Sequence, residues 1–383
     1  MGLPPDSLSS DPRPVIAVSM GDPCGIGPEV VVKALADRSL RGRARFRVFG
    51  WAYAMHLAAQ HAGIEPYWWR AAYSSSSPKD SEHGGGPAIP LACLHHDVVV
   101  LEESSLELDE SLLETLPGPT KAGGAASFRW VEDALACAMM RQGDPRAADA
   151  LVTSPIAKEA WDMAGSSRAR KFPGHTELLA ARCGAKRVAM LFVGPVLVVS
   201  LATVHVPLAN VPEILSIGRV FDTIELTHQA CMEMGRTGAG SAAGNPGRPR
   251  IAVCGLNPHA GERGLMGEEE QRIITPAIEL AVRAGIDAVG PVPGDAVFVA
   301  AAKQRYDAVV AMYHDQGLIP VKLLDRERTV NTTVGLRGPN GPVVRTSPAH
   351  GTAFDIAGKN AADAASMRAA IELALEIAAR QVR

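Results

Sequence analysis

The stretch VIAVSMGDPCGIGPEVVVKALA, residues 15–36, decides the fold class. Residues 15–20 form a β-branched run that is typical of a buried strand, and residues 28–36 predict a helix that starts at Pro28. The link, residues 21–29, carries three glycines and offers the free N–H groups of a helix N-terminus to a ligand. It matches neither the G-x-G-x-x-G fingerprint nor a Walker loop, so it indicates neither a Rossmann domain nor an NTPase. The alternative to a ligand-binding loop is a tight strand–helix turn.

The same alternation of β-branched runs and amphipathic stretches continues along the chain and predicts α/β layering. Further strands are expected at residues 46–49, 97–101, 150–153, 187–192, 196–202, 251–254, 308–312 and 342–345. Further helices are expected at residues 52–62, 122–141, 176–183, 219–234, 267–284 and 362–381. Residues 1–14 form a predicted disordered tail, and the Gly/Ser-rich segments 74–90 and 236–248 are predicted surface insertions.

The composition argues against several classes of protein. A chain of 383 residues with 47% hydrophobic residues can bury a large core, and this length favours two domains. The net charge of −3 gives no basic signal for nucleic acid. The longest apolar run, residues 188–204, is broken by Gly194 and Pro195, so no membrane span is expected. Six scattered cysteines without a C-x-x-C pair indicate reduced thiols, and we expect a cytoplasmic protein.

Three histidines, His205, His259 and His314, each follow an apolar run that is predicted to be a strand. In an open α/β sheet, ligands bind beyond the carboxyl ends of the strands. Imidazole is the commonest metal ligand, and three histidines with one open position would form a catalytic metal site. The spacings of 54 and 55 residues require the fold to bring them together. The alternative is three unrelated histidines at loop starts.

Further polar residues follow His314. Lys322, Asn331 and Arg345 combine an ammonium, an amide and a guanidinium, which together could hold a phosphate or carboxylate. Lys322 lies in the apolar run 319–324, so its charge is expected to pair or to reach solvent along its own stem. Asp295 is the acidic residue expected to reach a metal or a substrate hydroxyl.

Two further segments have the character of ligand-binding loops. Residues 174–177 open a predicted helix, where His175, Thr176 and the first backbone N–H groups could hold an anion; alternatively, Thr176 only caps the helix. Residues 350–359, HGTAFDIAGK, form a loop of small residues suited to a nucleotide, or an ordinary loop before the last helix.

Together and in this order, these segments resemble the 4-hydroxythreonine-4-phosphate dehydrogenases of pyridoxal phosphate biosynthesis. The resemblance runs from about Val15 to the C-terminus. It is densest in residues 21–29, 153–156, 174–177, 203–208, 257–262, 313–318 and 347–359. It implies the two-domain α/β fold of isocitrate and isopropylmalate dehydrogenases with a central cleft, and a homodimer that shares its active site. The expected domains are residues 15–125 with 320–383, and residues 126–319 with the dimer interface.

The resemblance also implies a reaction. A small phosphorylated substrate, 4-phosphohydroxy-L-threonine, is oxidised by NAD or NADP with one divalent metal (Zn, Mg or Co), and the β-keto acid decarboxylates to 3-amino-2-oxopropyl phosphate. The implied metal ligands are His205, His259 and His314, some of them from the partner subunit. The implied substrate-binding residues are His175, Thr176, Lys322, Asn331 and Arg345. Lys322 and Asp295 are the candidate catalytic residues, and Gly351, Asp355 and Gly358 are the candidate cofactor-binding residues.

The sequence departs from the family pattern at three places. Ala157 replaces a common asparagine, residues 262–266 replace a glycine-rich run, and an extra segment, 337–341, precedes Arg345. Three alternatives therefore stay open. The substrate could be a phosphorylated threonate or erythronate, the histidines could serve a metal hydrolase, or the chain could be an inactive paralogue that only binds metal or nucleotide.

Overall fold

The computed structural model describes residues 11–75, 86–114, 118–165, 169, 172–238 and 247–381. The first ten residues of the predicted tail, and residues 76–85 and 239–246 of the two predicted insertions, lie outside the described residues. The chain forms two compact units. The first contains the described residues up to Ala185 and from Leu336 onward, and the second is Lys186–Gly335.

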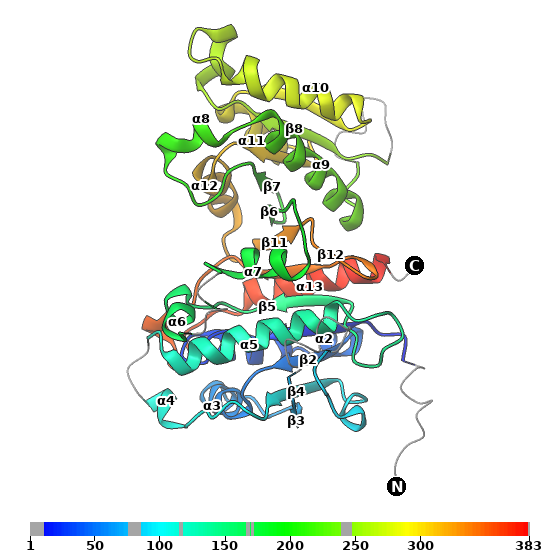
Figure 1. Ribbon diagram of the computed structural model, residues 1–383, viewed down its shortest axis with the longest axis vertical. Helices are drawn as coiled ribbons and strands as arrows, with labels where there is room; N and C mark the ends of the chain where they lie inside the picture. Colours follow the sequence, from blue (N-terminus) through cyan, green and yellow to red (C-terminus); the bar gives the residue numbers. More distant parts are fainter. Residues whose placement is uncertain are drawn as a thin grey trace. The chain divides into compact units, whose positions relative to one another are not determined.

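The first unit is built on six parallel strands in the order β3-β4-β2-β1-β5-β14 (Figure 1). The strands are β1 (Val15–Ser19), β2 (Arg45–Phe49), β3 (Trp69–Tyr73), β4 (Val98–Glu103), β5 (Ala150–Thr153) and β14 (Arg345–Pro348). The residues of β1 and β5 are fully buried, as expected for central parallel strands. The run 15–20 therefore sits at the middle of this sheet, where its apolar sequence predicts it.

Helices cover these strands. They are α1 (Gly27–Leu35), α2 (Arg38–Arg43), α3 (Ala52–Ala62), α4 (Ser111–Glu114), α5 (Lys121–Ala138), α6 (Lys158–Met163), α7 (His175–Arg182) and α13 (Ala365–Gln381). The long helix α5 packs against β1, β2, β5 and α6, and α13 packs against β14, β5 and α1 (Figure 1). The sequence expects a boundary at residue 125, but α5, β5, α6 and α7 all lie in the first unit, because α5 buries its apolar side on these strands.

The second unit has a mixed sheet in the order β11-β6-β7-β10-β8-β9. The strands are β6 (Ala189–Val193), β7 (Val198–Leu201), β8 (Arg250–Cys254), β9 (Asp287–Val292), β10 (Ala308–Ala311) and β11 (Val330–Val334). β6 is antiparallel to both β7 and β11, whereas β7, β10, β8 and β9 run parallel. Two short paired strands, β12 (Arg337–Gly338) and β13 (Gly341–Pro342), belong to the first unit and correspond to the extra segment before Arg345.

The helices of the second unit are α8 (Val211–Ile214), α9 (Ile217–Met234), α10 (Thr275–Arg283), α11 (Gly294–Ala302) and α12 (His314–Asp325), with a π-helical turn at Glu270–Ile274. Its core joins α9, α10, β8 and β10 through buried side chains such as Val220, Ile224, Val253 and Val310. Among the described residues, none of the helices combines the length and the apolar character that crossing a bilayer requires.

Candidate functional site

The three histidines follow three neighbouring strands of the second unit. β7, β10 and β8 are adjacent and parallel, so their carboxyl ends share one edge of the sheet. His205 follows β7, His314 is the first residue of α12 after β10, and His259 follows β8. This agrees with the sequence expectation that each histidine emerges beyond a strand end.

Two of these imidazoles are neighbours. The ring centroids of His205 and His314 are 5.8 Å apart, with the rings tilted by 45°. The Oγ1 of Thr203 donates to the carbonyl of Met312 at 2.7 Å and ties the two loops together. Asp315 Oδ1 lies 2.7 Å from His314 Nδ1, which orients the ring and leaves Nε2 for a ligand. This imidazole pair fits a divalent cation of borderline softness, such as Zn or Co.

His259 lies in a turn of unusual handedness. Residues 259–263 all have positive φ, with values of 53°, 53°, 76°, 44° and 60°, and Gly261 is the one glycine among them. A left-handed conformation costs a non-glycine residue about 1–2 kcal/mol, so surrounding contacts must maintain this turn. Within the described residues, no group of three or more His, Cys, Asp or Glu side chains is arranged to hold a metal.

The structure places the remaining predicted residues of the second unit on three elements. Lys322 lies on α12 and is exposed, so its charge reaches solvent, which is one of the two outcomes expected for a lysine in this run. The reason is that Ile319 and Leu323 of that run are themselves 65% and 82% exposed. Asn331 lies on β11, opposite Phe192 of β6, and Asp295 is exposed in the first turn of α11.

In the first unit, His175 is the first residue of α7. Its ring meets Trp161 edge to face at 5.7 Å. Its Nε2 is buried and has no hydrogen-bond partner among the described residues. Burial, and then the charges of Arg345 and Lys158, hold the pKa of His175 well below its usual value. The helix cap is Gly174, which makes no side-chain cap bond, so the interpretation of Thr176 as the N-cap is wrong.

Arg345 is a buried cation beside His175. Only 2% of it is exposed, and its Nη2 and Nε donate to Thr153 Oγ1 at 2.7 and 3.2 Å. Burial lowers its pKa to about 9, while Glu177 acts in the opposite direction, so the guanidinium stays charged at neutral pH. A buried guanidinium next to an imidazole with an open nitrogen can bind an anionic group of a substrate.

Lys158 was missed by sequence reasoning. It starts α6, and its side chain lies against Gly174, where an added Cβ would meet Lys158 Cε at 3.3 Å. The available signal was its position directly after the 153–156 segment, which leads from β5 into α6. Lys158, His175 and Arg345 thus place three nitrogen donors of the first unit around the start of α7.

The two glycine-containing loops of the first unit are neighbours. Ile26 N donates to the carbonyl of Thr352 at 2.9 Å, which joins the loop 21–29 to the loop 350–359. Gly358 lines a cavity of about 220 Å³ together with Gly25 and apolar residues of α3 and α4. Gly351 and Asp355 lie on the same loop, and the carbonyl of Asp355 accepts a hydrogen bond from Lys359 Nζ at 2.7 Å. The cavity is therefore lined by one glycine from each loop and by apolar side chains.

Comparisons with known proteins agree on one family. The family model described as "Pyridoxal phosphate biosynthetic protein PdxA" matches residues 74–374. A 4-hydroxythreonine-4-phosphate dehydrogenase of Desulfosudis oleivorans is 43% identical over 376 residues, covering 96% of this chain and 97% of the relative. A D-threonate 4-phosphate dehydrogenase of Cupriavidus necator is 42% identical over 376 residues, covering 97% and 99%.

The fold is also similar to that of a solved structure with the same name as the first of these relatives. The crystal structure of a 4-hydroxythreonine-4-phosphate dehydrogenase from Klebsiella pneumoniae is similar with a TM-score of 0.74 and 35% identity, covering 96% of this chain and 99% of that one. Such proteins have a fold like that of isocitrate and isopropylmalate dehydrogenases, so the α/β fold expected from the sequence is confirmed.

Proposed function

The chain belongs to the family of pyridoxal phosphate biosynthetic proteins PdxA, and on that premise we propose that it oxidises the C3 hydroxyl of 4-phosphohydroxy-L-threonine with NAD or NADP. The β-keto acid formed then loses carbon dioxide to give 3-amino-2-oxopropyl phosphate. The observation that carries the proposal is the similarity to named dehydrogenases over almost the whole chain. The paired imidazoles and the buried guanidinium supply the chemistry that this reaction needs.

The first unit would bind the charged and nucleotide parts of the reactants. Arg345, held by Thr153, offers a fixed guanidinium to a phosphate or carboxylate oxygen. His175 is neutral, so its Nε2, which has no partner among the described residues, can form one hydrogen bond with the substrate without adding charge to the site. Thr176 and the free N–H groups at the start of α7 lie beside it. Gly351, Asp355 and Gly358 would line the nucleotide, whose nicotinamide accepts the hydride when bound.

The second unit would hold the metal. His205, His259 and His314 would be its ligands, with Asp315 fixing the ring of His314. A divalent cation bound there supplies acidification of the substrate hydroxyl and stabilisation of the negative charge on oxygen. Lys322 and Asn331 would bind polar groups of the substrate, and Asp295 would accept or orient a proton at the reacting hydroxyl.

The relative from Cupriavidus necator indicates a second candidate substrate. This relative, which is 42% identical, is named a D-threonate 4-phosphate dehydrogenase, whereas other relatives of similar identity are named 4-hydroxythreonine-4-phosphate dehydrogenases. The two substrates share the phosphate, so the buried Arg345 serves either of them.

An assay that follows reduced nicotinamide tests both candidates. The purified protein is given 4-phosphohydroxy-L-threonine or D-threonate 4-phosphate, each with NAD and with NADP, before and after treatment with a chelator. We expect turnover with the amino acid that stops on chelation and returns with added Zn, Co or Mg. Faster turnover of the threonate would establish the alternative. Metal-dependent turnover of a phosphate ester without reduction of the nicotinamide would show a hydrolase instead.

We further propose that the chain acts as a homodimer through α12. Ile319, Leu323 and Leu324 on this helix are 65%, 82% and 50% exposed, which is unfavourable on a monomer in water. We expect Leu323→Glu to convert a dimer to a monomer in analytical ultracentrifugation while the circular dichroism spectrum is retained. Val282→Glu on α10, where the valine is 53% exposed, is the matched control and should remain dimeric. A dimeric Leu323→Glu variant would rule out α12 as the contact.

A further inference from the structure

The left-handed turn that carries His259 is attached to one buried carboxylate. Glu270, at the start of the π-helical turn, is only 3% exposed. Its Oε1 accepts hydrogen bonds from the backbone N–H groups of Leu256 and Asn257, both at 2.7 Å. Its Oε2 accepts a third, from Asn257 Nδ2 at 3.0 Å. The two residues that lead into the turn are therefore fixed by a single side chain.

The same carboxylate also lies against the turn itself. A Cβ added to Gly261, the middle residue of the turn, would be 2.6 Å from Glu270 Oε2. A Cβ added to Gly255 would be 3.2 Å from Oε1. Both glycines are thus close to the carboxylate, and a larger residue at position 261 would push it away. Glu269 adds one further bond, from Asn257 Nδ2 at 2.7 Å.

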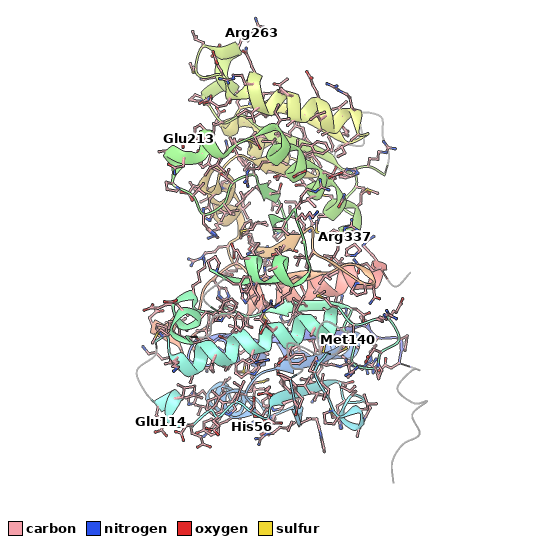
Figure 2. The ribbon with its side chains drawn as sticks, viewed as in Figure 1. His56, Glu114, Met140, Glu213, Arg263 and Arg337 are labelled. Atoms are coloured by element: carbon pink, nitrogen blue, oxygen red, sulfur yellow. The ribbon has the colours of Figure 1, made fainter. Side chains whose placement is uncertain are left out.

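The left-handed turn needs support from a neighbouring group such as Glu270, because most of its own residues disfavour a left-handed conformation. Four of the five left-handed residues carry side chains, His259, Ala260, Glu262 and Arg263, and Figure 2 shows Arg263 projecting at the tip of the second unit. Leu265, which follows, is 79% exposed, so little apolar packing holds the tip. Strain of this kind persists where neighbouring groups impose it, and π-helical turns are frequent at functional sites.

We infer that Glu270 is a positioning residue for His259: its three hydrogen bonds and its contact with Gly261 hold the left-handed turn that presents this imidazole as a metal ligand. The inference rests on the proposed metal-dependent function. In this role Glu270 would contact neither metal nor substrate and would act through the backbone of residues 256–261. Second-layer groups of this kind commonly change metal affinity by about 10- to 100-fold.

The test uses the full-length protein and Co²⁺ alone as the probe. Co²⁺ affinity and the visible Co²⁺ spectrum are measured for wild type, Glu270→Ala, Glu270→Gln, His259→Ala and the double variant His259→Ala/Glu270→Ala. Glu268→Gln, an exposed carboxylate on the same segment that pairs with Arg272, is the matched control. Amide hydrogen exchange of residues 256–266 in the metal-free protein gives a second readout.

We expect Glu270→Ala to weaken Co²⁺ binding about 10- to 100-fold and to shift the spectrum toward that of His259→Ala. The double variant should bind no more weakly than His259→Ala, because both changes remove the same ligand. Glu270→Gln keeps one acceptor oxygen and the side-chain volume, so it should fold and show a smaller loss. Exchange of residues 256–266 should increase in both variants, and Glu268→Gln should match wild type in every readout.

Two results would overturn the inference. Faster exchange with unchanged Co²⁺ affinity would show that Glu270 stabilises the turn without serving the ligand, and additive losses in the double variant would show that the two residues act independently. A wild-type protein that binds no Co²⁺ would instead refute the metal site of the proposed function, and the inference with it.

Discussion

At the scale of single residues, the proposed substrate site of the first unit combines a histidine kept neutral with a guanidinium that stays charged. Arg345 and the Nε2 atom of His175 are both buried, but burial affects the charges of the two side chains differently. It removes the proton from His175, whose pKa falls well below its usual value, whereas Arg345 retains its charge because its pKa falls only to about 9. A substrate anion bound at the proposed site would therefore meet the fixed charge of Arg345 and a neutral imidazole.

We expect His175 to remain neutral as the pH falls through the range in which an ordinary histidine gains its proton, because burial lowers its pKa well below the usual value. Its nitrogen resonances, assigned by their loss in His175→Gln, should show no titration in this range. The same variant should raise the KM of the substrate about 10-fold or more, since one hydrogen bond to a charged group is lost. A titration midpoint between pH 6 and 7 would contradict the burial of this ring.

Residue-scale prediction from sequence was effective where a polar side chain follows an apolar strand. His205, His259 and His314 each follow a strand, as the sequence predicts, because strand ends can be recognised by composition. Their role as metal ligands stays a proposal. Lys158 was not found, because nothing in the sequence shows that the start of α6 lies against Gly174. Glu270 was missed for a similar reason. Its three donors, which come from two residues more than ten positions earlier, are brought to it only by the left-handed turn.

At the scale of elements, Glu29 joins α1 to the loop that precedes α13. Glu29 is 5% exposed, and its Oε1 accepts hydrogen bonds from Ala362 N at 2.8 Å and Lys33 Nζ at 2.7 Å. Lys33 Nζ also donates to the carbonyl of Ala362 at 2.9 Å. One ion pair on α1 therefore fixes the end of the loop that contains Gly351, Asp355 and Gly358.

Glu29→Ala should leave the N–H of Ala362 unsatisfied and lower the free energy of unfolding by about 1–3 kcal/mol. Hydrogen exchange in residues 350–362 should increase, and the KM for the dinucleotide should rise, because Glu29 also lines the cavity beside Gly358. Glu65→Ala, on the surface of the same unit, is the control and should change none of these. Unchanged exchange in the loop would show that other contacts hold it.

Helices and strands whose apolar residues recur with a clear period were predicted, and elements without such a pattern were missed. Helix α3 was expected at its observed bounds, Ala52–Ala62. Helix α12 was missed because Pro320 lies inside it, and proline normally ends a helix. β3 was missed because Trp69 and Arg70 are exposed, so this edge strand has no buried apolar run. The predicted strand 342–345 begins three residues later, at Arg345, because residues 341 and 342 pair with β12 instead.

At the scale of the whole molecule, stability should depend on buried carboxyl groups. Asp133 of α5 is 4% exposed and accepts a hydrogen bond from Tyr73 at 2.8 Å. Burial raises its pKa from 3.8 to about 6. The folded state therefore holds this proton more tightly than the unfolded chain does. As pH rises from 4 to above 6, the charge must form in a buried position and stability falls.

Asp133→Asn removes this ionisation. The free energy of unfolding of the variant, relative to wild type, should therefore rise by about 2–3 kcal/mol between pH 4 and pH 7.5, an order-of-magnitude value from a shift of about two pKa units. Urea denaturation at both pH values measures it. Asp109→Asn, at an exposed carboxylate whose pKa is lowered by Ser111, should give no such rise. A difference independent of pH would mean that Asp133 ionises as it does in the unfolded chain.

The division of the chain into units also affects the order in which it can fold during synthesis. The second unit is one continuous segment, Lys186–Gly335, whereas the first needs both ends of the chain. β14 pairs with β5 at Arg345–Leu151 and Thr346–Val152, and α13 then packs on both strands. A ribosome delivers β14 and α13 after the whole second unit, so the second unit can complete its core while the first still exposes an open edge at β5. The first unit therefore begins before the second but is completed after it, and the growing chain must protect the edge of β5 from other strands until β14 emerges.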